Sequence, residues 1–567
     1  MTLRRLRHLA PGLAALRGFR RDDLVPDVVA GLSVAAVALP VGIAYAEIAQ
    51  VPPIIGLYAA IFPLFAYALF GSSRQLIIGP DAATCVMAAS AVGAIAAGDP
   101  LRYAGLMAAL TLLTGLLYLA AGALRLGFIS SFLSRPILTG YLNGIALIII
   151  VGQVPKLCGL VAEGDSFLAK LTSLWVQLDQ VHPASLALGA ALLILLLVMR
   201  HFAPRLPAAL IAATLGILAV AALGLAGHGV AVLGPVGAGL PSFGLPQVSL
   251  ADLPPLLQDA AGITLISFIS GVLTAQSFAR RNGYDIDANQ ELRAFGAGNL
   301  VSGLAQGFPV TGADSRTAVS NAMGGRTQLV GIVAGAAMLV FLLFFTGPLA
   351  LLPATALAAI IIASAIGLLD IAALRHLWQA SGRELAFSLA TTAAVLFLGV
   401  LPGVLLAVVL SLLWFVSVNS RPHDAILGRA PGVGGFHDVT DYPQAATIPG
   451  LLLYRFDANL VFFNCDYFKT RVLSHLDAAA TPVEWVVVDA SPISIIDYTA
   501  VRMLDDLRQE LKARGIVFAS ARAKQSLQRY FRADWVNSRG EALELRPFPT
   551  INAAIEAFQH RRQSPRR

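Results

Sequence analysis

Charged residues are scarce in this chain. Of its 567 residues only 13% are Asp, Glu, Lys or Arg, whereas a soluble chain has about 25%. Hydrophobic residues make up 57% of the sequence instead. This balance excludes an ordinary water-soluble protein and indicates one that is embedded in a membrane.

Cysteine and histidine are also rare. The three cysteines are Cys85 in an apolar stretch, Cys158 near its predicted outer face and Cys465 in the C-terminal region. They would lie in different compartments, which excludes a disulfide framework. The nine histidines form no enzyme or metal-binding signature. We therefore expect no enzyme activity, no cofactor and no metal site.

Long apolar runs fill the first 420 residues. Eleven are long enough, or nearly so, to cross a bilayer, and two broken spans and one short span complete the set. The total is fourteen predicted crossings, at 27–49, 54–70, 80–97, 103–123, 137–154, 184–199, 207–227, 256–278, 292–306, 313–323, 326–346, 353–369, 384–400 and 402–418.

The net charge of +7 is explained by topology. The first 23 residues are rich in arginine and lack the apolar core of a cleavable signal, so we expect them to stay in the cytoplasm. Basic residues also cluster in the loops that an even count of spans places inside, such as Arg280 and Arg281. We expect a protein of the inner membrane with both termini cytoplasmic, and no binding of nucleic acid.

Two polar interruptions occupy matching places in the two halves of this region. Residues 79–84 follow the apolar run 76–78, and residues 311–316 follow 308–310. Interrupted spans at corresponding positions are the best sequence pointer to a transporter's binding site. A half-helix that begins inside the membrane presents unpaired N–H groups and a partial positive charge. Two such ends facing each other would form an anion site.

The composition changes near residue 421, where ordinary charge density begins. Apolar segments at 451–456, 460–463, 485–489 and 516–519 are typical of strands, and 499–512, 523–532 and 550–560 of helices. This alternation predicts a small cytoplasmic α/β domain. The predicted organisation is a cytoplasmic segment at 1–23, a transmembrane domain at 24–420, a linker at 421–436, the α/β domain at 437–560 and a basic tail at 561–567.

Several motifs give the chain a resemblance to a known family. They are Gly71-Ser72-Ser73-Arg74 with Gly79-Pro80, residues 134–141 (SRPILTGY), residues 283–292 (GYDIDANQEL), and Gly307-Phe308-Pro309-Val310 with Ser315-Arg316-Thr317-Ala318. The chain resembles the bacterial sulfate permease (SulP) family, related to the animal anion exchangers that include pendrin and prestin. Its C-terminal part resembles a STAS domain.

The resemblance implies a polytopic α-helical fold built as a seven-plus-seven inverted repeat. It also implies a homodimer, an elevator-like movement of a core bundle against a gate bundle, and an anion held between the third and tenth spans. Tyr45 matches an aromatic residue that lines the family's pocket, although it could equally be a packing tyrosine.

The two interruptions supply the other candidate anion-binding residues. Arg316 carries a full positive charge within a span. A charge in this position costs free energy and usually has a function. The alternative is that its side chain reaches the cytoplasm or pairs with an acidic residue. Ser315 and Thr84 are candidate hydroxyl donors, or else local helix caps. Three residues would contribute only backbone N–H groups: Ala82, Ala83 and Ala313.

Two positions depart from the family pattern. Val41 follows Pro40 where many relatives have Gln, which removes a polar contact. Ser270 stands where relatives coupled to H⁺ or Na⁺ carry Glu or Asp, and serine cannot titrate. The remaining coupling candidates are Asp314, Thr274 and Asp81, and each aspartate could instead cap its half-helix. H⁺ and Na⁺ are the candidate co-ions.

Three functions are consistent with these features. The first is secondary transport of an inorganic anion, sulfate foremost, with bicarbonate and C4-dicarboxylates as rivals. The second is a nucleobase permease, against which Ser270 and the C-terminal domain argue. The third is an anion sensor or scaffold that acts through the STAS domain. In that domain Tyr498 replaces the serine that is phosphorylated in anti-sigma-factor antagonists, so a phosphoserine switch is not expected.

Overall fold

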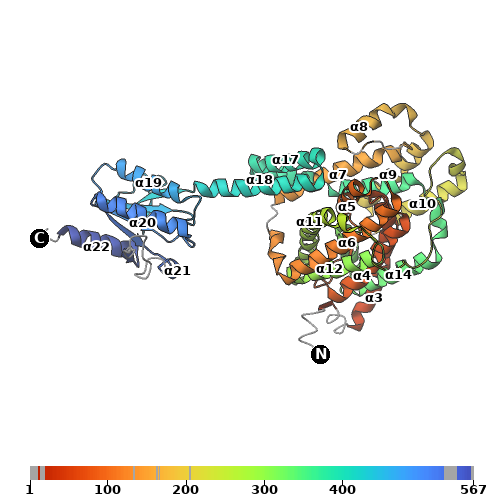
Figure 1. The fold of residues 1–567 in the computed structure, drawn as a ribbon, viewed down its shortest axis with the longest axis horizontal. Coiled ribbons are helices and arrows are strands. Elements are labelled where there is room, and N and C mark those ends of the chain that lie inside the picture. Colours follow the sequence, from red (N-terminus) through yellow and green to blue (C-terminus); the bar gives the residue numbers. More distant parts are fainter. Residues whose placement is uncertain are drawn as a thin grey trace. The chain divides into compact units, whose positions relative to one another are not determined.

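The computed structural model describes residues 11–12, 20–131, 135–160, 164, 166–203, 206–528 and 546–563. The chain divides into two compact units, Met1–Val409 and Leu410–Arg567 (Figure 1). Most of the predicted segment 1–23, the start of the motif at 134–141, part of the predicted helix 523–532 and the end of the predicted tail lie outside the described residues.

The helices of the membrane region occur in the same order twice. The first series is α3 (Leu24–Ile48), α4 (Pro53–Phe70), β1 (Ile78–Gly79), α5 (Ala82–Ala96), α6 (Pro100–Ala123), α7 (Arg135–Leu157), α8 (Phe167–Val176), α9 (Pro183–Phe202) and α10 (Ala208–Leu223). The second is α11 (Leu253–Arg281), α12 (Ala288–Leu304), β2 (Thr311–Gly312), α13 (Asp314–Ala322), α14 (Leu329–Phe344), α15 (Ala354–Leu368), α16 (Ile371–Ala380), α17 (Gly382–Leu398) and α18 (Val400–Ser420).

Each of the fourteen predicted spans coincides with a helix. Among the described residues, eight helices are long and apolar enough to cross a membrane, and α5, α8, α10 and α14 are shorter apolar helices. The sequence did not predict α8 and α16. These short helices contain Lys170 and Arg375, respectively, which interrupt the apolar runs.

The helices pack in two groups. In the first, α12 packs against α4 and α6, and α14 packs against α3 and α4. In the second, α7 packs against α15 and α17, and α9 packs against α15. Close packing depends on small residues, because a Cβ on Gly56 of α4 would lie 2.2 Å from the carbonyl oxygen of Gly42 in α3. Apart from α3 with α4, every pairing named here joins a helix of the first series to one of the second. Exchanging the two series turns one pairing into another, as with α6–α12 and α4–α14 or α7–α17 and α9–α15, which is expected for an inverted repeat.

The loop that leads into β1 is anchored to α12. The buried carboxylate of Glu291 accepts hydrogen bonds from the Tyr67 hydroxyl at 2.7 Å and from the backbone N–H groups of Ser72 and Ser73 at 2.9 and 3.0 Å. Two of the quoted motifs, over 200 residues apart, therefore meet here. Since a buried carboxylate must be satisfied by donors, this contact fixes where β1 and α5 begin.

The C-terminal unit contains a six-stranded sheet of order β4-β3-β5-β6-β7-β8. Strands β5 (Leu451–Phe456), β6 (Trp485–Asp489), β7 (Val517–Ala521) and β8 (Arg546–Phe548) pair in parallel. Helices α19 (Cys465–Asp477) and α20 (Tyr498–Ala513) share a core with one face, and α22 (Ile551–Gln563) with the other. The helix α21 (Gln525–Gln528) follows β7.

Two sequence predictions for this unit need correction. The sheet begins before the predicted boundary at residue 437, because β3 (Asp424–Gly428) pairs antiparallel with both β5 and β4 (His437–Asp438). Residues 460–463 form no strand. Asn464 accepts a hydrogen bond from the Val461 N–H through its side chain and turns the chain into α19.

Candidate anion site

The two interruptions lie next to each other in space. Strands β1 and β2 pair antiparallel, with Ile78 opposite Gly312 and Gly79 opposite Thr311. The Ala313 N–H extends the pairing by donating to the carbonyl oxygen of Ile77 at 2.9 Å. Each strand leads directly into a half-helix, so both α5 and α13 begin at this short strand pair. Both positive helix ends therefore act on the same region.

The two N-termini are capped differently. At α5, the carboxylate of Asp81 accepts hydrogen bonds from the N–H groups of Ala83 and Thr84 at 3.1 and 3.4 Å. At α13, the residue before the helix is Ala313, and no side chain caps it. The Ala83 N–H, a predicted anion donor, is thus already engaged by a carboxylate. The N-terminus of α13 is left with unpaired N–H groups, which favour an anion.

Asp314 does not act as the cap of α13. It is the first residue of the helix, and one of its carboxylate oxygens accepts a hydrogen bond from the hydroxyl of Thr274 on α11. The same hydroxyl oxygen lies 3.0 Å from the carbonyl oxygen of Ser270, so its single proton is shared between the two acceptors. Three predicted coupling residues therefore form one contiguous cluster. Asp81 is the fourth and serves as the N-cap of α5.

Arg316 lies across the junction between the half-helices. Its side chain is only 2% exposed, and Nη2 donates to the carbonyl oxygen of Pro80, just before α5. Its Nε is buried and has no hydrogen-bond partner among the described residues. A buried cation with an unused donor is unfavourable unless something pairs with it. The alternative that Arg316 reaches the cytoplasm is wrong.

Gly79 makes room for this arginine. A Cβ at that position would lie 2.8 Å from Nη1 of Arg316, and the backbone φ of +152° is one that side-chain-bearing residues rarely adopt. Both facts require glycine here. Sequence reasoning identified the motif but not this contact, because the partner lies 237 positions away.

The hydroxyl residues have separate roles. Thr84 is buried and shares a hydrogen bond of 3.0 Å with Ser267 of α11, while the carbonyl of Ser267 accepts from Thr311 at 2.7 Å. Ser267 therefore connects both interruptions, a role that sequence reasoning missed because small polar residues in spans are common. Ser315, in contrast, is exposed at the start of α13, as is Asp314.

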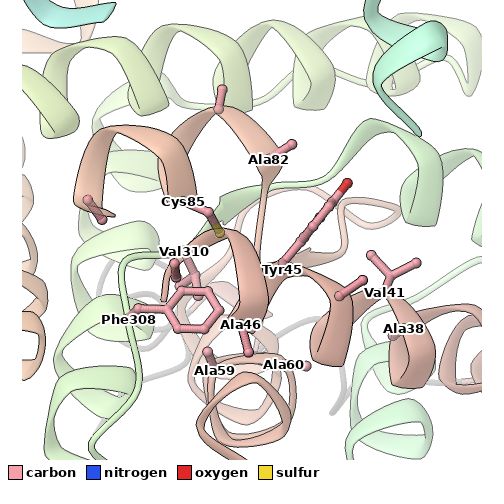
Figure 2. Packing of buried hydrophobic residues seen from close by; sticks show 14 of the residues in the cluster. Ala38, Val41, Tyr45, Ala46, Ala59, Ala60, Ala82, Cys85, Phe308 and Val310 are labelled. Carbon is pink, nitrogen blue, oxygen red and sulfur yellow. The ribbon is translucent and has the colours of Figure 1, made fainter. Parts of the chain in front are cut away.

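Tyr45 contributes from α3. It is 7% exposed, and its hydroxyl lies near the side chains of Asp81, Arg316 and Ser364. Figure 2 shows the ring extending from α3 toward the start of α5, where Ala82 lies, with Val41 on the same helix and Cys85 nearby. The predicted residues Tyr45, Ala82, Ala83, Ala313 and Arg316 are thus gathered around one junction.

Known proteins resemble this chain over nearly its full length. The model of the sulfate permease family matches residues 24–391, and that of the STAS domain matches 442–534. A probable sulfate transporter of Mycobacterium tuberculosis (strain H37Rv) is 45% identical over 553 residues, 97% of this chain and 98% of the relative. The chloroplastic Sulfate transporter 4.1 of Arabidopsis thaliana is 33% identical over 90% of this chain and 77% of its own length.

Two solved structures share the architecture. The murine Solute Carrier 26 family member A9 anion transporter, in its inward-facing state, matches with a TM-score of 0.90 at 20% identity, covering 98% of this chain and 94% of the transporter. The transmembrane domain of the cyanobacterium bicarbonate transporter BicA matches with a TM-score of 0.60 at 25% identity, covering 69% of this chain and 98% of that domain.

Proposed function

Because this chain belongs to the sulfate permease family and carries a STAS domain, we propose that it is a secondary active transporter with sulfate as its principal substrate. The chain is a multi-pass anion transporter of the membrane and not an enzyme. The proposal concerns its substrate, its site, its coupling and its movement.

One observation carries the proposed site. The antiparallel β1–β2 pair brings the N-termini of α5 and α13 together, and the buried guanidinium of Arg316 lies between them. Sulfate would bind at the uncapped end of α13, taking backbone N–H groups and the hydroxyl of Ser315, with Arg316 supplying the charge. Charge-assisted hydrogen bonds of this kind are about twice as strong as neutral ones.

Coupling to a cation follows from the charges at the junction. Arg316 provides one positive charge, while Asp81 and Asp314 each add a negative charge in their ionised forms. An arriving dianion would leave this region strongly negative, which is unfavourable away from water. Asp314 contacts the hydroxyl of Thr274 and is exposed, so it is the carboxylate that we assign to binding of H⁺, with Na⁺ as the alternative.

The two packing groups suggest how the site moves. The half-helices pack with α3 and α6 of the first group and with α11, which itself packs against α6. In an elevator-like movement this group would carry the anion past the second group, which contains α7, α9, α15 and α17. We also propose a homodimer in the inner membrane, with both termini in the cytoplasm and the STAS domain in a regulatory or assembly role.

Bicarbonate is the second candidate substrate. The similarity of the membrane region to a cyanobacterial bicarbonate transporter domain at 25% identity favours it. A scaffold that binds anion without transporting it remains the alternative of another class. Bicarbonate would use the same helix ends with less need for a coupled cation, because it carries one negative charge instead of two.

Uptake by proteoliposomes distinguishes these candidates. The purified full-length protein would be reconstituted and supplied with labelled sulfate, bicarbonate or succinate, with and without inward gradients of H⁺ or Na⁺. We expect sulfate uptake that an inward H⁺ gradient stimulates. Preferred uptake of bicarbonate would support the second candidate, and anion binding without uptake of any substrate would support the scaffold.

A further inference from the structure

Two exposed apolar side chains lie on neighbouring loops of the C-terminal unit. Phe462, in the turn before α19, is 67% exposed, and Ile495, in the loop before α20, is 59% exposed. The Phe462 N–H donates to the carboxylate of Asp497 at 2.7 Å, and Leu460 forms a β-bridge with Ile496. The two loops are therefore held to each other. We refer to Phe462 and Ile495 as the loop pair.

The loop pair lies beside the end of the last apolar helix. The side-chain amide of Asn464 donates to the carbonyl oxygen of Asn419 at 3.1 Å, and Asn419 is the penultimate residue of α18. The apolar segment Pro402–Ser420 has 19 residues. At 1.5 Å per residue it rises about 28 Å, close to the thickness of a bilayer's hydrocarbon core. If α18 spans the bilayer, Asn419 lies at the level of the lipid headgroups. Phe462 is two positions from Asn464, the residue that contacts Asn419.

Two positively charged side chains lie near the loop pair. Lys524 is exposed, and its ammonium group donates to the hydroxyl of Ser494, the residue before Ile495. Arg421 is exposed and directly follows α18. The carboxylate of Asp497 is engaged by two backbone N–H groups, those of Phe462 and Ala500. Exposed apolar side chains next to positive charges are attracted to the surface of a membrane that contains anionic lipids.

We propose that the loop pair docks the STAS domain on the membrane surface. Phe462 and Ile495 enter the headgroup region of the leaflet at which α18 ends, and Lys524 and Arg421 contact lipid phosphates. Burial at the interface removes the two side chains from water, which is the driving force. The contact sets the orientation of the domain relative to the bilayer, and it does not depend on which anion the protein carries.

Quenching by brominated lipid tests this contact in the full-length protein. Cys158, which is partly exposed, would be replaced by serine, and a bimane label would be attached at Ile495→Cys, leaving buried Cys85 and Cys465 in place. The protein would be placed in nanodiscs that contain brominated phosphatidylcholine, with or without phosphatidylglycerol. We expect strong quenching that rises with phosphatidylglycerol and falls when Phe462→Ser or Lys524→Gln is added.

Val433 provides the matched control. It is 42% exposed and lies in the loop after β3, at the opposite end of that strand from α18. A label at Val433→Cys should show little quenching, and Val433→Ser should not change the signal at position 495. Equal quenching at the two positions would overturn the proposal. The label at position 495 could also be protected from water in both detergent and bilayer but not be quenched by brominated lipid. That result would overturn the proposal and indicate that the loop pair contacts protein instead.

Discussion

Arg316 and Pro80 join the two halves of the membrane region. The guanidinium of Arg316, in the first turn of α13, donates to the carbonyl oxygen of Pro80, which precedes α5. The bond holds a positive charge beside the N-termini of both half-helices. An arginine in this position compensates for the carboxylate of Asp81, which caps α5, and leaves the end of α13 available to an anion.

Gly79→Ala should impair transport by displacing Arg316. The new Cβ would lie 2.8 Å from Nη1, and the backbone φ of +152° disfavours alanine. We expect sulfate uptake to fall by about tenfold or more, equivalent to about 1.4 kcal/mol of binding. Uptake into proteoliposomes at subsaturating sulfate is the measurement.

Gly93→Ala is the control for this change. Gly93 lies in α5, the half-helix that follows β1, and a Cβ there meets nothing within 4 Å. Its uptake should equal that of the unmodified protein. If Gly79→Ala also transports normally, the close approach of Arg316 to β1 is not needed for transport.

Asp314→Asn should show whether Asp314 couples transport to H⁺ or only caps a helix. The side chain of Asp314 contacts Thr274 and caps no helix, so its loss should abolish stimulation of uptake by an inward H⁺ gradient while anion exchange continues. Asp81→Asn should keep the start of α5 folded, because asparagine caps helices about as well as aspartate, and should retain the stimulation by an inward H⁺ gradient. The measurement is uptake from acidic to neutral pH. A profile for Asp314→Asn that matches the unmodified protein would reject its coupling role.

Much of this site follows from local sequence. The two interruptions could be recognised because Gly and polar residues break apolar runs at matching places, and the membrane environment makes such breaks costly. Ser270, Thr274 and Asp314 were each named as coupling candidates, but the sequence did not predict that hydrogen bonds join them. Local sequence could not predict the contacts between segments that lie far apart in the chain. The pairing of Gly79 with Arg316 and the link from Ser267 to Thr84 depend on how α11, α5 and α13 pack.

Most helices and strands of the fold could also be predicted from local sequence. Apolar length and the two polar interruptions located fourteen of the sixteen helices that the structure describes in the membrane region. The other two, α8 and α16, were not predicted because charged residues interrupt their short apolar sequences. The sequence predicts a linker where strand β3 lies, since five residues beside a Gly- and Pro-rich stretch give little indication of a strand. Its place in the sheet is set by tertiary pairing with β5, which overrides local preference.

Removal of the C-terminal unit should leave anion binding intact. Residues of both half-helices lie upstream of position 330, so we expect lower expression or rate with unchanged anion preference. Truncation after Ser420 should behave better than truncation after Phe436, because the latter leaves β3 without β5 and exposes an unpaired edge. The readouts are size-exclusion behaviour and competition by unlabelled anions. A changed anion preference in a well-folded truncation would contradict this expectation.

Asp424 should stabilise the C-terminal unit in a pH-dependent way. Burial alone would raise its pKa, but hydrogen bonds from Arg471 at 2.9 Å and His475 at 3.1 Å outweigh this and lower the pKa of Asp424. A carboxyl group whose pKa is lowered in the folded state stabilises the fold at pH values above its pKa in the unfolded chain, which is about 3.9. This stabilisation is lost as the pH falls through the pKa of the folded state. Asp424→Asn should therefore cost about 1–3 kcal/mol at neutral pH and much less in acid.

Hydrogen exchange of the β3 and β5 peptides in urea, followed against pH, measures this effect. Asp477→Asn is the control, because the Asp477 side chain is 71% exposed in its ion pair with Arg514, and such pairs contribute about 0–1 kcal/mol. A destabilisation by Asp424→Asn that is the same at neutral and acidic pH would show that the ion pair is not its cause.

Sulfate uptake by Arg316→Ala and Arg316→Lys tests the central claim most directly. Both variants would first be shown to be folded by size-exclusion chromatography and thermal unfolding. Loss of a charge-assisted hydrogen bond costs about 1.5–3 kcal/mol, so Arg316→Ala should weaken sulfate binding by about 10- to 100-fold and abolish measurable uptake. Arg316→Lys should be impaired as well, since its ammonium lacks the planar donor geometry of guanidinium. Unchanged uptake kinetics in a folded Arg316→Ala protein would contradict the assignment of the anion site to the junction of α5 and α13.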